Sequence, residues 1–145
     1  MRNDLVYSCG VDDKVKAWSI PNEELKYEIG HGGCVNDIAV GFEGTPLANR
    51  LISISNDKSC RVSNLETGAE VKRIYLCSEC WSIAVDKTQT VIAVGTKKGV
   101  TFIETTNFTK VKEVSLTNVC SLAFNNRNDR MLAVTENGEV HSFKF

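Results

Sequence analysis

Apolar and polar residues alternate along this chain in short segments of about five to seven residues, and polar turns separate the segments. Residues 50–55 (RLISIS) and 59–64 (SCRVSN) flank the turn Asn56-Asp57-Lys58. β-Branched residues on both sides of a polar turn are typical of a β-hairpin. Segments of this kind recur along the chain, and none has the 3.6-residue periodicity of an amphipathic helix. The pattern therefore predicts an all-β fold.

The strand–turn–strand pattern returns at a nearly fixed interval. The second strand of each hairpin closes at steps of 45, 40 and 40 residues, on Trp18, Ser63, Ile103 and Phe143. The turns before these strands hold, at the same steps, Asp12, Asp57, Lys97 and Asn137. A period of about 40–45 residues with four short strands per unit is typical of a propeller blade. The alternative is a β-sandwich with evenly spaced turns, which the shared period of several independent series disfavours.

A further strand precedes the hairpin in three units, and its copies match position by position. It reads VNDIAV at 35–40, CWSIAV at 80–85 and VCSLAF at 119–124. The first unit is expected to lack this strand, because residues 1–4 are too few to form it. The last unit is expected to lack the strand that follows its hairpin. Two complete four-stranded blades should therefore lie between two incomplete three-stranded blades.

We expect a single propeller segment over residues 1–145. Its divisions are a partial blade 1 at 5–29, blade 2 at 30–76, blade 3 at 77–116 and a partial blade 4 at 117–145. The expected strands are 5–10, 14–18, 24–28, 34–40, 50–55, 59–64, 70–76, 80–85, 90–95, 99–104, 110–116, 119–124, 130–135 and 139–145.

These units resemble the repeats of the WD-repeat β-propeller family. The family ends its third strand with Trp-Asp, and Trp18-Ser19 keeps the tryptophan of that pair; Gly30-His31 matches its Gly-His dipeptide. Leu65-Glu66-Thr67-Gly68 fits the turn after the third strand. The resemblance implies a buried hydrogen-bonded set of a turn aspartate, a histidine, a serine and a tryptophan. The matching residues are His31, Ser53 and Asp57 in unit two, where Ser63 replaces the indole, and Ser8, Asp12 and Trp18 in unit one.

The resemblance also implies a closed ring, and propellers use about four to eight blades. Three and a half units would leave apolar faces and unpaired strand edges at both ends, which favour association. The chain therefore looks like the C-terminal half of a larger propeller, which a second copy or a missing N-terminal half would complete.

Charge and composition narrow the class of partner. The chain has 17 Lys and Arg against 18 Asp and Glu, for a net charge of −1. Nucleic-acid binding through phosphates is therefore not expected. No apolar run reaches the roughly 18–20 residues of a membrane helix, and the N-terminus lacks the apolar core of a signal peptide. We expect a soluble protein of the cytoplasm or nucleus, without a membrane partner, whose six cysteines are free thiols.

No catalytic motif appears among the histidines, cysteines and carboxylates. Cys77 and Cys80 have the spacing of a zinc half-site, but no second Cys-x-x-Cys occurs, and Cys80 falls on an apolar position of its strand. The turn aspartates are of the kind that stabilise local hydrogen bonding. We expect neither an enzyme nor a cofactor or metal.

The remaining interpretation is a non-catalytic scaffold that binds a protein or peptide. In the WD-repeat family, partners often dock on the edge that carries the hairpin turns and the start of the inner strand. Trp81 is the strongest candidate, because a large amphipathic ring at such a position is a usual binding hot spot; the alternative is that its ring packs between blades. The alternatives are an assembly subunit that pairs strand edges and, less favoured, a propeller enzyme. The candidate positions are Val11, Asn56, Thr96 and Glu136 in the turns, and Asn36, Trp81 and Cys120 on the inner strands.

Overall fold

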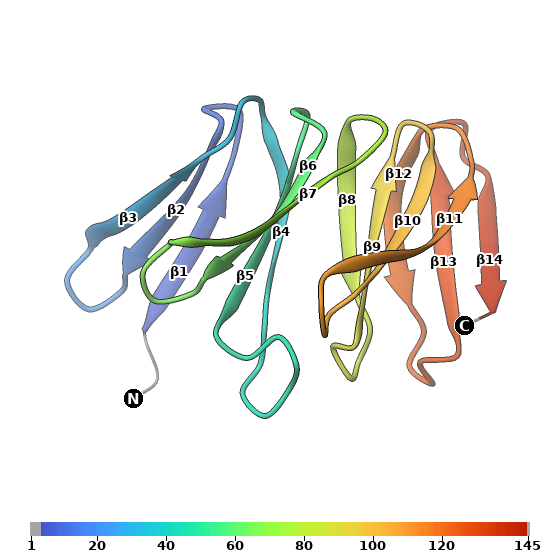
Figure 1. Cartoon of the computed structure of the whole chain (residues 1–145). Helices are drawn as coiled ribbons and strands as arrows, with labels where there is room; N and C mark the ends of the chain where they lie inside the picture. Colours follow the sequence, from blue (N-terminus) through green and yellow to red (C-terminus); the bar gives the residue numbers. More distant parts are fainter. Residues whose placement is uncertain (1–3, 145) are drawn as a thin grey trace.

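The computed structural model describes residues 4–144, which form four antiparallel sheets of three, four, four and three strands. Each sheet is continuous in sequence, and the four lie in succession from one end of the molecule to the other (Figure 1). The described residues contain no helix, and hence none that could cross a membrane. The expected fold class is confirmed: this is a partial β-propeller with two complete blades between two three-stranded ones.

The strands pair in sequence order within each blade. Blade 1 contains β1 (Leu5–Cys9), β2 (Lys14–Ser19) and β3 (Glu24–Gly30); blade 2 contains β4 (Val35–Val40), β5 (Arg50–Ser55), β6 (Ser59–Asn64) and β7 (Glu70–Tyr75); blade 3 contains β8 (Cys80–Val85), β9 (Val91–Thr96), β10 (Gly99–Glu104) and β11 (Thr109–Ser115); blade 4 contains β12 (Val119–Phe124), β13 (Arg130–Thr135) and β14 (Val140–Lys144). These bounds agree with the expected strands to within two residues.

Apolar side chains pack between neighbouring blades rather than in one common core. Val15 of blade 1 and Leu51 of blade 2 belong to the first cluster, and both are fully buried. Ile54 and Ile92 belong to the cluster between blades 2 and 3, while Met131 packs in the cluster between blades 3 and 4. Burial of apolar area is the main stabilising term in folding, so each blade depends on the blade beside it.

The first strands of blades 2, 3 and 4 each contain a β-bulge. In β4, Val35 pairs with Ser55 and Asp37 pairs with Ile54, so that Asn36 is the extra residue. β8 and β12 show the same irregularity. The extra residues are Asn36, Trp81 and Cys120. A bulge bends a strand and redirects its side chains, and here it does so at equivalent positions in three blades.

Immediately after the bulge, side chains connect one first strand to the next. The backbone N–H of Ile83 in β8 donates to Asp37 Oδ2 in β4 at 3.1 Å. The N–H of Leu122 in β12 donates to Ser82 Oγ in β8, also at 3.1 Å. We call these two contacts the inner-strand links. They bond blade 2 to blade 3 and blade 3 to blade 4 by the same geometry.

A second set of bonds joins the blades at the opposite edge. The buried side chain of Gln89 accepts hydrogen bonds from the Phe42 N–H at 2.9 Å and from Thr45 Oγ1 at 2.5 Å. The carboxylate of buried Asp86 accepts from Asn128 Nδ2 at 3.1 Å. The β8–β9 turn therefore bonds to the corresponding loops of both neighbours.

One hairpin turn differs from the expected alignment. Five residues separate Ile54 from Cys60, which pair with each other, whereas four separate Gly95 from Val100. The turn in blade 3 is thus one residue shorter. As a result Thr96 is the counterpart of Ser55, not of Asn56. The exposed position that Asn56 has in blade 2 is occupied by Lys97 in blade 3.

Gly99, the first residue of β10, lies very close to the neighbouring strand β11. It has φ +147°, and a Cβ atom there would lie 1.9 Å from the Val114 carbonyl oxygen. Gly138 also has positive φ, at +81°, but a Cβ atom there meets nothing within 4 Å. A side chain at Gly138 would therefore cause backbone strain alone, whereas a side chain at Gly99 would cause both backbone strain and steric overlap.

We predict that Gly138→Ala lowers the free energy of unfolding by about 1–2 kcal/mol, the usual penalty for a side chain at positive φ. Gly99→Ala should lower it by more than about 3 kcal/mol, because backbone must also move. Chemical denaturation of both variants measures the difference. Equal losses would contradict the close approach of β10 and β11.

Candidate partner-binding face

One edge of the blades carries the hairpin turns β1–β2, β5–β6, β9–β10 and β13–β14 together with the starts of β4, β8 and β12. It is the upper edge in Figure 1, and we call it the turn face. All seven sequence-derived candidates lie in or next to it. The long β4–β5 loop and the β8–β9 turn lie at the opposite edge.

Exposure divides the seven candidates into three groups. Val11 is 89% exposed, and Asn36, Asn56, Cys120 and Glu136 are also exposed. Trp81 is half-buried, so that part of its ring is open to solvent. Thr96 is a correction: it is 1% exposed and donates its hydroxyl to the Gly99 carbonyl at 3.2 Å. The shorter turn of blade 3 withdraws it from the surface.

Asn36 is held in place by two hydrogen bonds. Its Nδ2 donates to Asn56 Oδ1 at 2.7 Å and to the carbonyl of Cys80 at 2.7 Å. The second bond crosses from blade 2 to blade 3 and ends one residue before Trp81. Asn36 is thus fixed between Asn56 and the strand that carries Trp81.

Blade 4 contributes two turn-face candidates, and both are bonded within that blade. Glu136 Oε2 accepts from Asn118 Nδ2 at 2.8 Å. Cys120 is exposed, and its Sγ contacts the Val134 carbonyl at 3.3 Å. The bulge explains this exposure, because it turns the extra residue of β12 away from the blade interface.

Below the turn face, blade 2 builds the polar network that the sequence suggested. His31 Nδ1 lies 3.1 Å from Asp57 Oδ2, and His31 Nε2 lies 2.8 Å from Ser53 Oγ. The imidazole side chain has no exposed surface. Asp57 also accepts from the backbone N–H of Gly32 at 2.9 Å. The loop that leads into β4 is thereby fastened to the β5–β6 hairpin.

Arg61 is a member of this network that the sequence analysis missed. It is 9% exposed, and its guanidinium donates to Asp57 Oδ2 at 3.0 Å and to the Gly30 carbonyl at 2.6 Å. A signal was present in the sequence, because Lys16 stands 45 residues earlier and binds Asp12 Oδ2 at 2.5 Å. A basic residue that pairs with the turn aspartate therefore recurs at the same 45-residue step as the aspartate itself.

The electrostatics of the network fix its protonation state. Burial, followed by the positive charge of Arg61, lowers the pKa of His31 below its usual value of 6.5. Burial alone would raise the pKa of Asp57, but hydrogen bonds from the Ser59 hydroxyl and from the Gly32 and Ser59 N–H groups outweigh it and hold that pKa well below its usual range. A carboxylate can only accept, so a neutral His31 donates from Nδ1 and accepts the Ser53 hydroxyl at Nε2.

Blade 1 contains a related set without an imidazole. Trp18 Nε1 donates to Ser8 Oγ at 3.1 Å, and Asp12 pairs with Lys16. Conversely, blade 2 has Ser63 in the place of the indole. Ser63 is fully buried, and its Oγ has no hydrogen-bond partner in the part of the chain that the structure describes. Neither blade therefore contains all four groups.

The cysteines form no site in this structure. All six are free, and burial raises the pKa of Cys80 to about 12, with Asp57 adding to the effect. Cys77 is exposed while Cys80 is buried. Over residues 4–144, no three His, Cys, Asp or Glu side chains converge closely enough to hold a metal ion.

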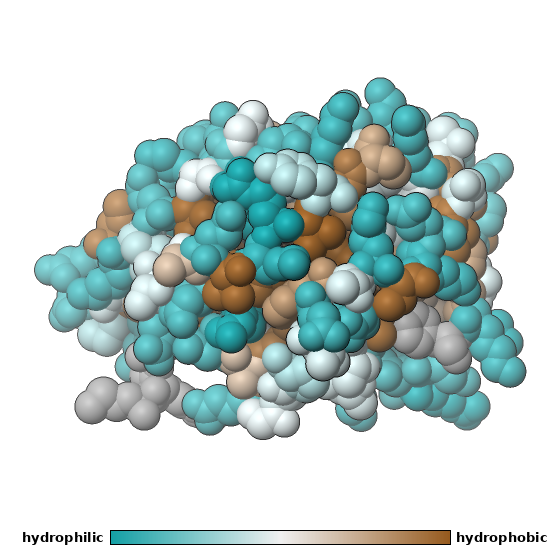
Figure 2. Space-filling model, in the orientation of Figure 1, coloured by the Kyte–Doolittle hydropathy of each residue, from teal (hydrophilic) through white to brown (hydrophobic). Residues whose placement is uncertain are grey.

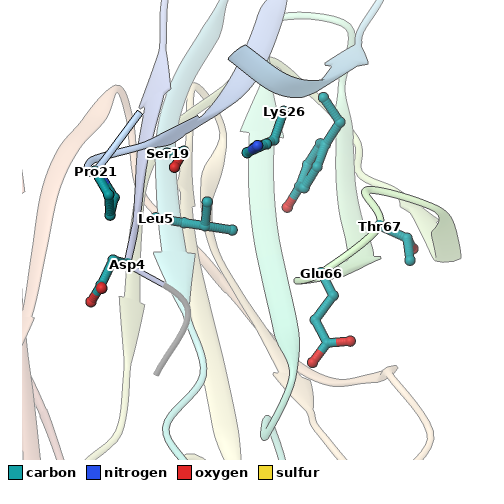
Figure 3. A pocket seen from close by; sticks show the side chains of 8 residues that line it. Asp4, Leu5, Ser19, Pro21, Lys26, Glu66 and Thr67 are labelled. Atoms are coloured by element: carbon teal, nitrogen blue, oxygen red, sulfur yellow. The ribbon is translucent and has the colours of Figure 1, made fainter. Parts of the chain in front are cut away.

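A groove lies away from the turn face, between blade 1 and the β6–β7 turn (Figure 3). Its volume is about 680 Å³, and no candidate residue lines it. Tyr27, which does line it, donates its hydroxyl to the Leu65 carbonyl at 2.5 Å and so joins blade 1 to blade 2. The lining residues are Asp4, Leu5, Ser19, Pro21, Lys26, Tyr27, Glu66 and Thr67.

No known protein family and no curated protein matches this sequence. Among solved structures, the crystal structure of the computationally designed Ika4 protein is similar, with a TM-score of 0.84. The alignment covers 100% of this chain and 88% of that chain at 18% sequence identity. That likeness shows the fold alone. In total 1156 solved chains match, and so common a fold does not by itself indicate an activity.

Ser63 and Ser53 provide a matched test of the network. Ser63→Ala removes a buried hydroxyl without a partner and should raise the free energy of unfolding by about 1 kcal/mol. Ser53→Ala leaves buried His31 Nε2 unpaired and should lower it by about 1–3 kcal/mol. Urea denaturation measures both. The assignment is wrong if the two alanine variants shift stability in the same direction.

The depressed pKa of His31 predicts a loss of stability in acid. The unfolded chain binds this proton more readily than the folded chain, so the stabilising contribution is complete above pH 6.5 and decreases as the pH falls below that value. Unfolding midpoints measured between pH 7.5 and 5.5 should fall, and His31→Gln should reduce the slope. His141→Gln is the control and should keep it; an unchanged slope in His31→Gln would contradict the buried neutral imidazole.

Proposed function

We propose that this chain is a non-catalytic, WD-repeat-type interaction scaffold that binds a peptide or protein domain through its turn face. The proposed mechanism is rigid display: the blades hold turn and bulge residues in a fixed array for a partner to contact. The proposed setting is the cytoplasm or nucleus, with neither a nucleic acid nor a membrane as partner. The near-neutral net charge of −1 supports a protein rather than a polyanion as ligand.

The observation that carries this proposal is the arrangement of Asn36 and Trp81. Asn36 is fixed by bonds to Asn56 and to the Cys80 carbonyl, and Trp81 follows directly at an equivalent bulge of the next blade. An aromatic ring beside pre-positioned polar groups is the usual composition of a binding hot spot. Side chains that are already ordered lose little entropy on binding.

The non-catalytic part of the proposal is supported by the roles that buried carboxylates already have. Asp57 accepts from His31, Arg61 and the Gly32 N–H. Asp86 accepts from the hydroxyls of Thr88 and Thr90 and from the Val91 N–H. Burial raises the pKa of both groups, but hydrogen bonds outweigh it and lower the pKa: for Asp57 chiefly those from Ser59 and Gly32, for Asp86 chiefly those from Thr88 and Val91. A carboxylate bound in this way is a weak base, which favours a structural role over general acid–base work.

A second candidate role is assembly within a larger complex, and the exposed apolar residues of blade 1 favour it. Among the described residues, blade 1 carries more of them than any other blade, three in its strands and two in its turns. They are Val6, Val11, Trp18, Ile20 and Leu25, with exposed fractions of 50%, 89%, 37%, 57% and 43%. By contrast, hydrophilic residues predominate on the face seen in Figure 2. We propose that a second copy or a complementary propeller half covers this surface.

Trp81→Ala tests the proposed binding face. Peptides selected from a random display library against the wild-type chain should bind the variant at least about tenfold more weakly, as expected for a hot-spot residue. Circular dichroism and the unfolding midpoint should be nearly unchanged. Phe42→Ala is the control, because Phe42 is an exposed aromatic residue, 67% accessible, at the opposite edge.

Two results would contradict the proposal. One is equal binding of the selected peptides to wild type and Trp81→Ala, particularly if Phe42→Ala weakens it. The other is loss of folding in Trp81→Ala, which would show that the indole supports the interface between blades rather than a partner.

A further inference from the structure

Three exposed lysines lie on the turn face around the loop that connects β7 to β8. Lys58 belongs to the β5–β6 turn of blade 2, and Lys97 and Lys98 form the β9–β10 turn of blade 3. We call these three residues the lysine patch. The carboxylate of Glu79, in the loop between the two turns, feels the charge of all three. Three ammonium groups around one carboxylate leave an excess of two positive charges.

The lysine patch is not neutralised by the rest of the described chain. Elsewhere a lysine has a carboxylate close by, as Lys16 does at 2.5 Å from Asp12 Oδ2. Over residues 4–144, by contrast, no member of the patch forms an ion pair. The pKa of Glu79 is lowered by a hydrogen bond from its own backbone N–H and then, against the opposing effect of burial, by the charges of the patch. The positive potential therefore remains available to an external anion.

Hydrogen bonds fix the backbone beneath the patch. The Lys97 N–H donates to the Glu79 carbonyl at 3.1 Å, and the Lys97 carbonyl accepts the Asn118 N–H at 2.9 Å. The Lys58 carbonyl accepts the Leu76 N–H at 2.8 Å. Because Leu76 and Glu79 belong to the same β7–β8 loop, the turns of two blades are bonded to one loop. The fold thus sets the spacing of the charges, and only the side chains adapt to a ligand.

The backbone conformation of Lys58 indicates that its charge is the reason for its presence. Lys58 has φ +66°, a left-handed conformation that favours Gly, Asn or Asp. Its counterpart Asp13, 45 residues earlier, has φ +63° and is a residue of the favoured kind. A residue that breaks a local rule without a structural gain is typical of a functional position.

A groove beside Lys97 and Lys98 provides room for an extended segment. Its volume is about 630 Å³, and it lies between the β9–β10 turn and the connection from β11 to β12. Leu116 contributes apolar surface, and Ser115 and Thr117 contribute hydroxyl groups. The lining residues are Lys97, Lys98, Ser115, Leu116, Thr117 and Asn118.

The surroundings of the patch favour a short acidic peptide over a nucleic acid or a single phosphate. Asp13 in the β1–β2 turn and Glu136 in the β13–β14 turn place negative charge on either side of it. A long polyanion across the turn face would bring its phosphates close to these carboxylates. Neither turn of the patch contains an arginine, whose fork matches one phosphate. Separate ammonium groups on two turns instead suit several separate carboxylates.

We propose that the partner segment at the turn face is an acidic peptide, and that at least two of its Asp or Glu carboxylates bind Lys58, Lys97 and Lys98. The segment continues along the groove beside Leu116. Trp81 follows Glu79 by two residues, so the same segment reaches its ring. This inference rests on the proposed function and names the chemistry of the partner.

A synthetic peptide and its neutral analogue test the proposal. The probe is Gly-Glu-Glu-Phe-Glu-Glu-Gly, acetylated and amidated, and it is added to the ¹⁵N-labelled chain at low ionic strength. Saturable NMR shifts are expected at the amides of the lysine patch and at the Trp81 indole N–H. The analogue with Gln in place of every Glu should bind at least about tenfold more weakly. Added salt should weaken the acidic peptide, because salt screens exposed charges.

Variants of the protein locate the charges. Lys97→Gln combined with Lys98→Gln should weaken binding of the acidic peptide by at least about tenfold. Lys58→Asn should also weaken it, while its unfolding midpoint equals or exceeds that of wild type, because asparagine tolerates positive φ. Lys87→Gln is the matched control, since Lys87 is exposed at the opposite edge, and it should bind as wild type.

Three results would overturn the inference. The first is no saturable shift up to about 1 mM peptide, the range of weak binding. The second is equal binding of the acidic peptide to wild type and to the Lys97→Gln, Lys98→Gln variant. The third is tighter binding of an oligouridylate of similar length with the same dependence on the lysines, which would identify a nucleic acid as the partner.

Peptides selected from the display library separate this inference from the proposed function. They should be enriched in Asp and Glu relative to the starting library. Selected peptides that depend on Trp81 but bind the lysine variants as well as wild type would overturn this inference and leave the proposed function intact. Acidic peptides that depend on the lysines but not on Trp81 would support this inference and contradict the role of Trp81.

Discussion

The structure depends on one repeated contact, the inner-strand link. In β4 and β8 the bulge is followed by a polar side chain, and that side chain accepts an N–H from the next blade at 3.1 Å in both links. Small blades bury little apolar area by themselves, so their stability comes from neighbours. The links set the register in which Ile54, Ile92 and Met131 meet the facing blade. Without them, apolar contact would be less specific in orientation, because it has no direction.

The polar network of blade 2 holds a loop in place through buried hydrogen bonds. His31, Asp57 and Arg61 fasten the loop between blades 1 and 2 to the β5–β6 hairpin. A buried group of this kind stabilises the fold only when its members are paired, and Ser63 is the member that is not. Blade 1 has the matching Ser8, Asp12 and Trp18, and among residues 4–144 no imidazole is bonded to them. The polar groups of blade 1 are therefore understood from their counterparts in blade 2.

Much of the fold could be predicted from the sequence, because hairpin turns and strand alternation are local signals. The period placed β5, β6, β8, β10, β12 and β13 at the bounds that the structure has. The resemblance to WD repeats implied the set of His31, Ser53 and Asp57, and the structure brings these three side chains together. The position of Thr96 was predicted one residue off, because the turn residues and strand ends keep a 40-residue step although the β9–β10 turn is one residue shorter than the β5–β6 turn. Arg61 was missed because its role depends on a carbonyl, that of Gly30, which a residue pattern does not display. Asp37 and Ser82 were visible as polar residues in apolar strands, but their partners lie in other blades.

Native-state hydrogen exchange, measured at a concentration where light scattering shows a monomer, tests the central claim most directly. If blades are stabilised mainly by their neighbours, amides of β5 and β9 should exchange most slowly, through global unfolding. Amides of β1 and β14, which belong to blades with a neighbour on one side, should exchange faster through opening of the ends. Protection of β1 and β14 equal to that of β5 and β9 would contradict the account.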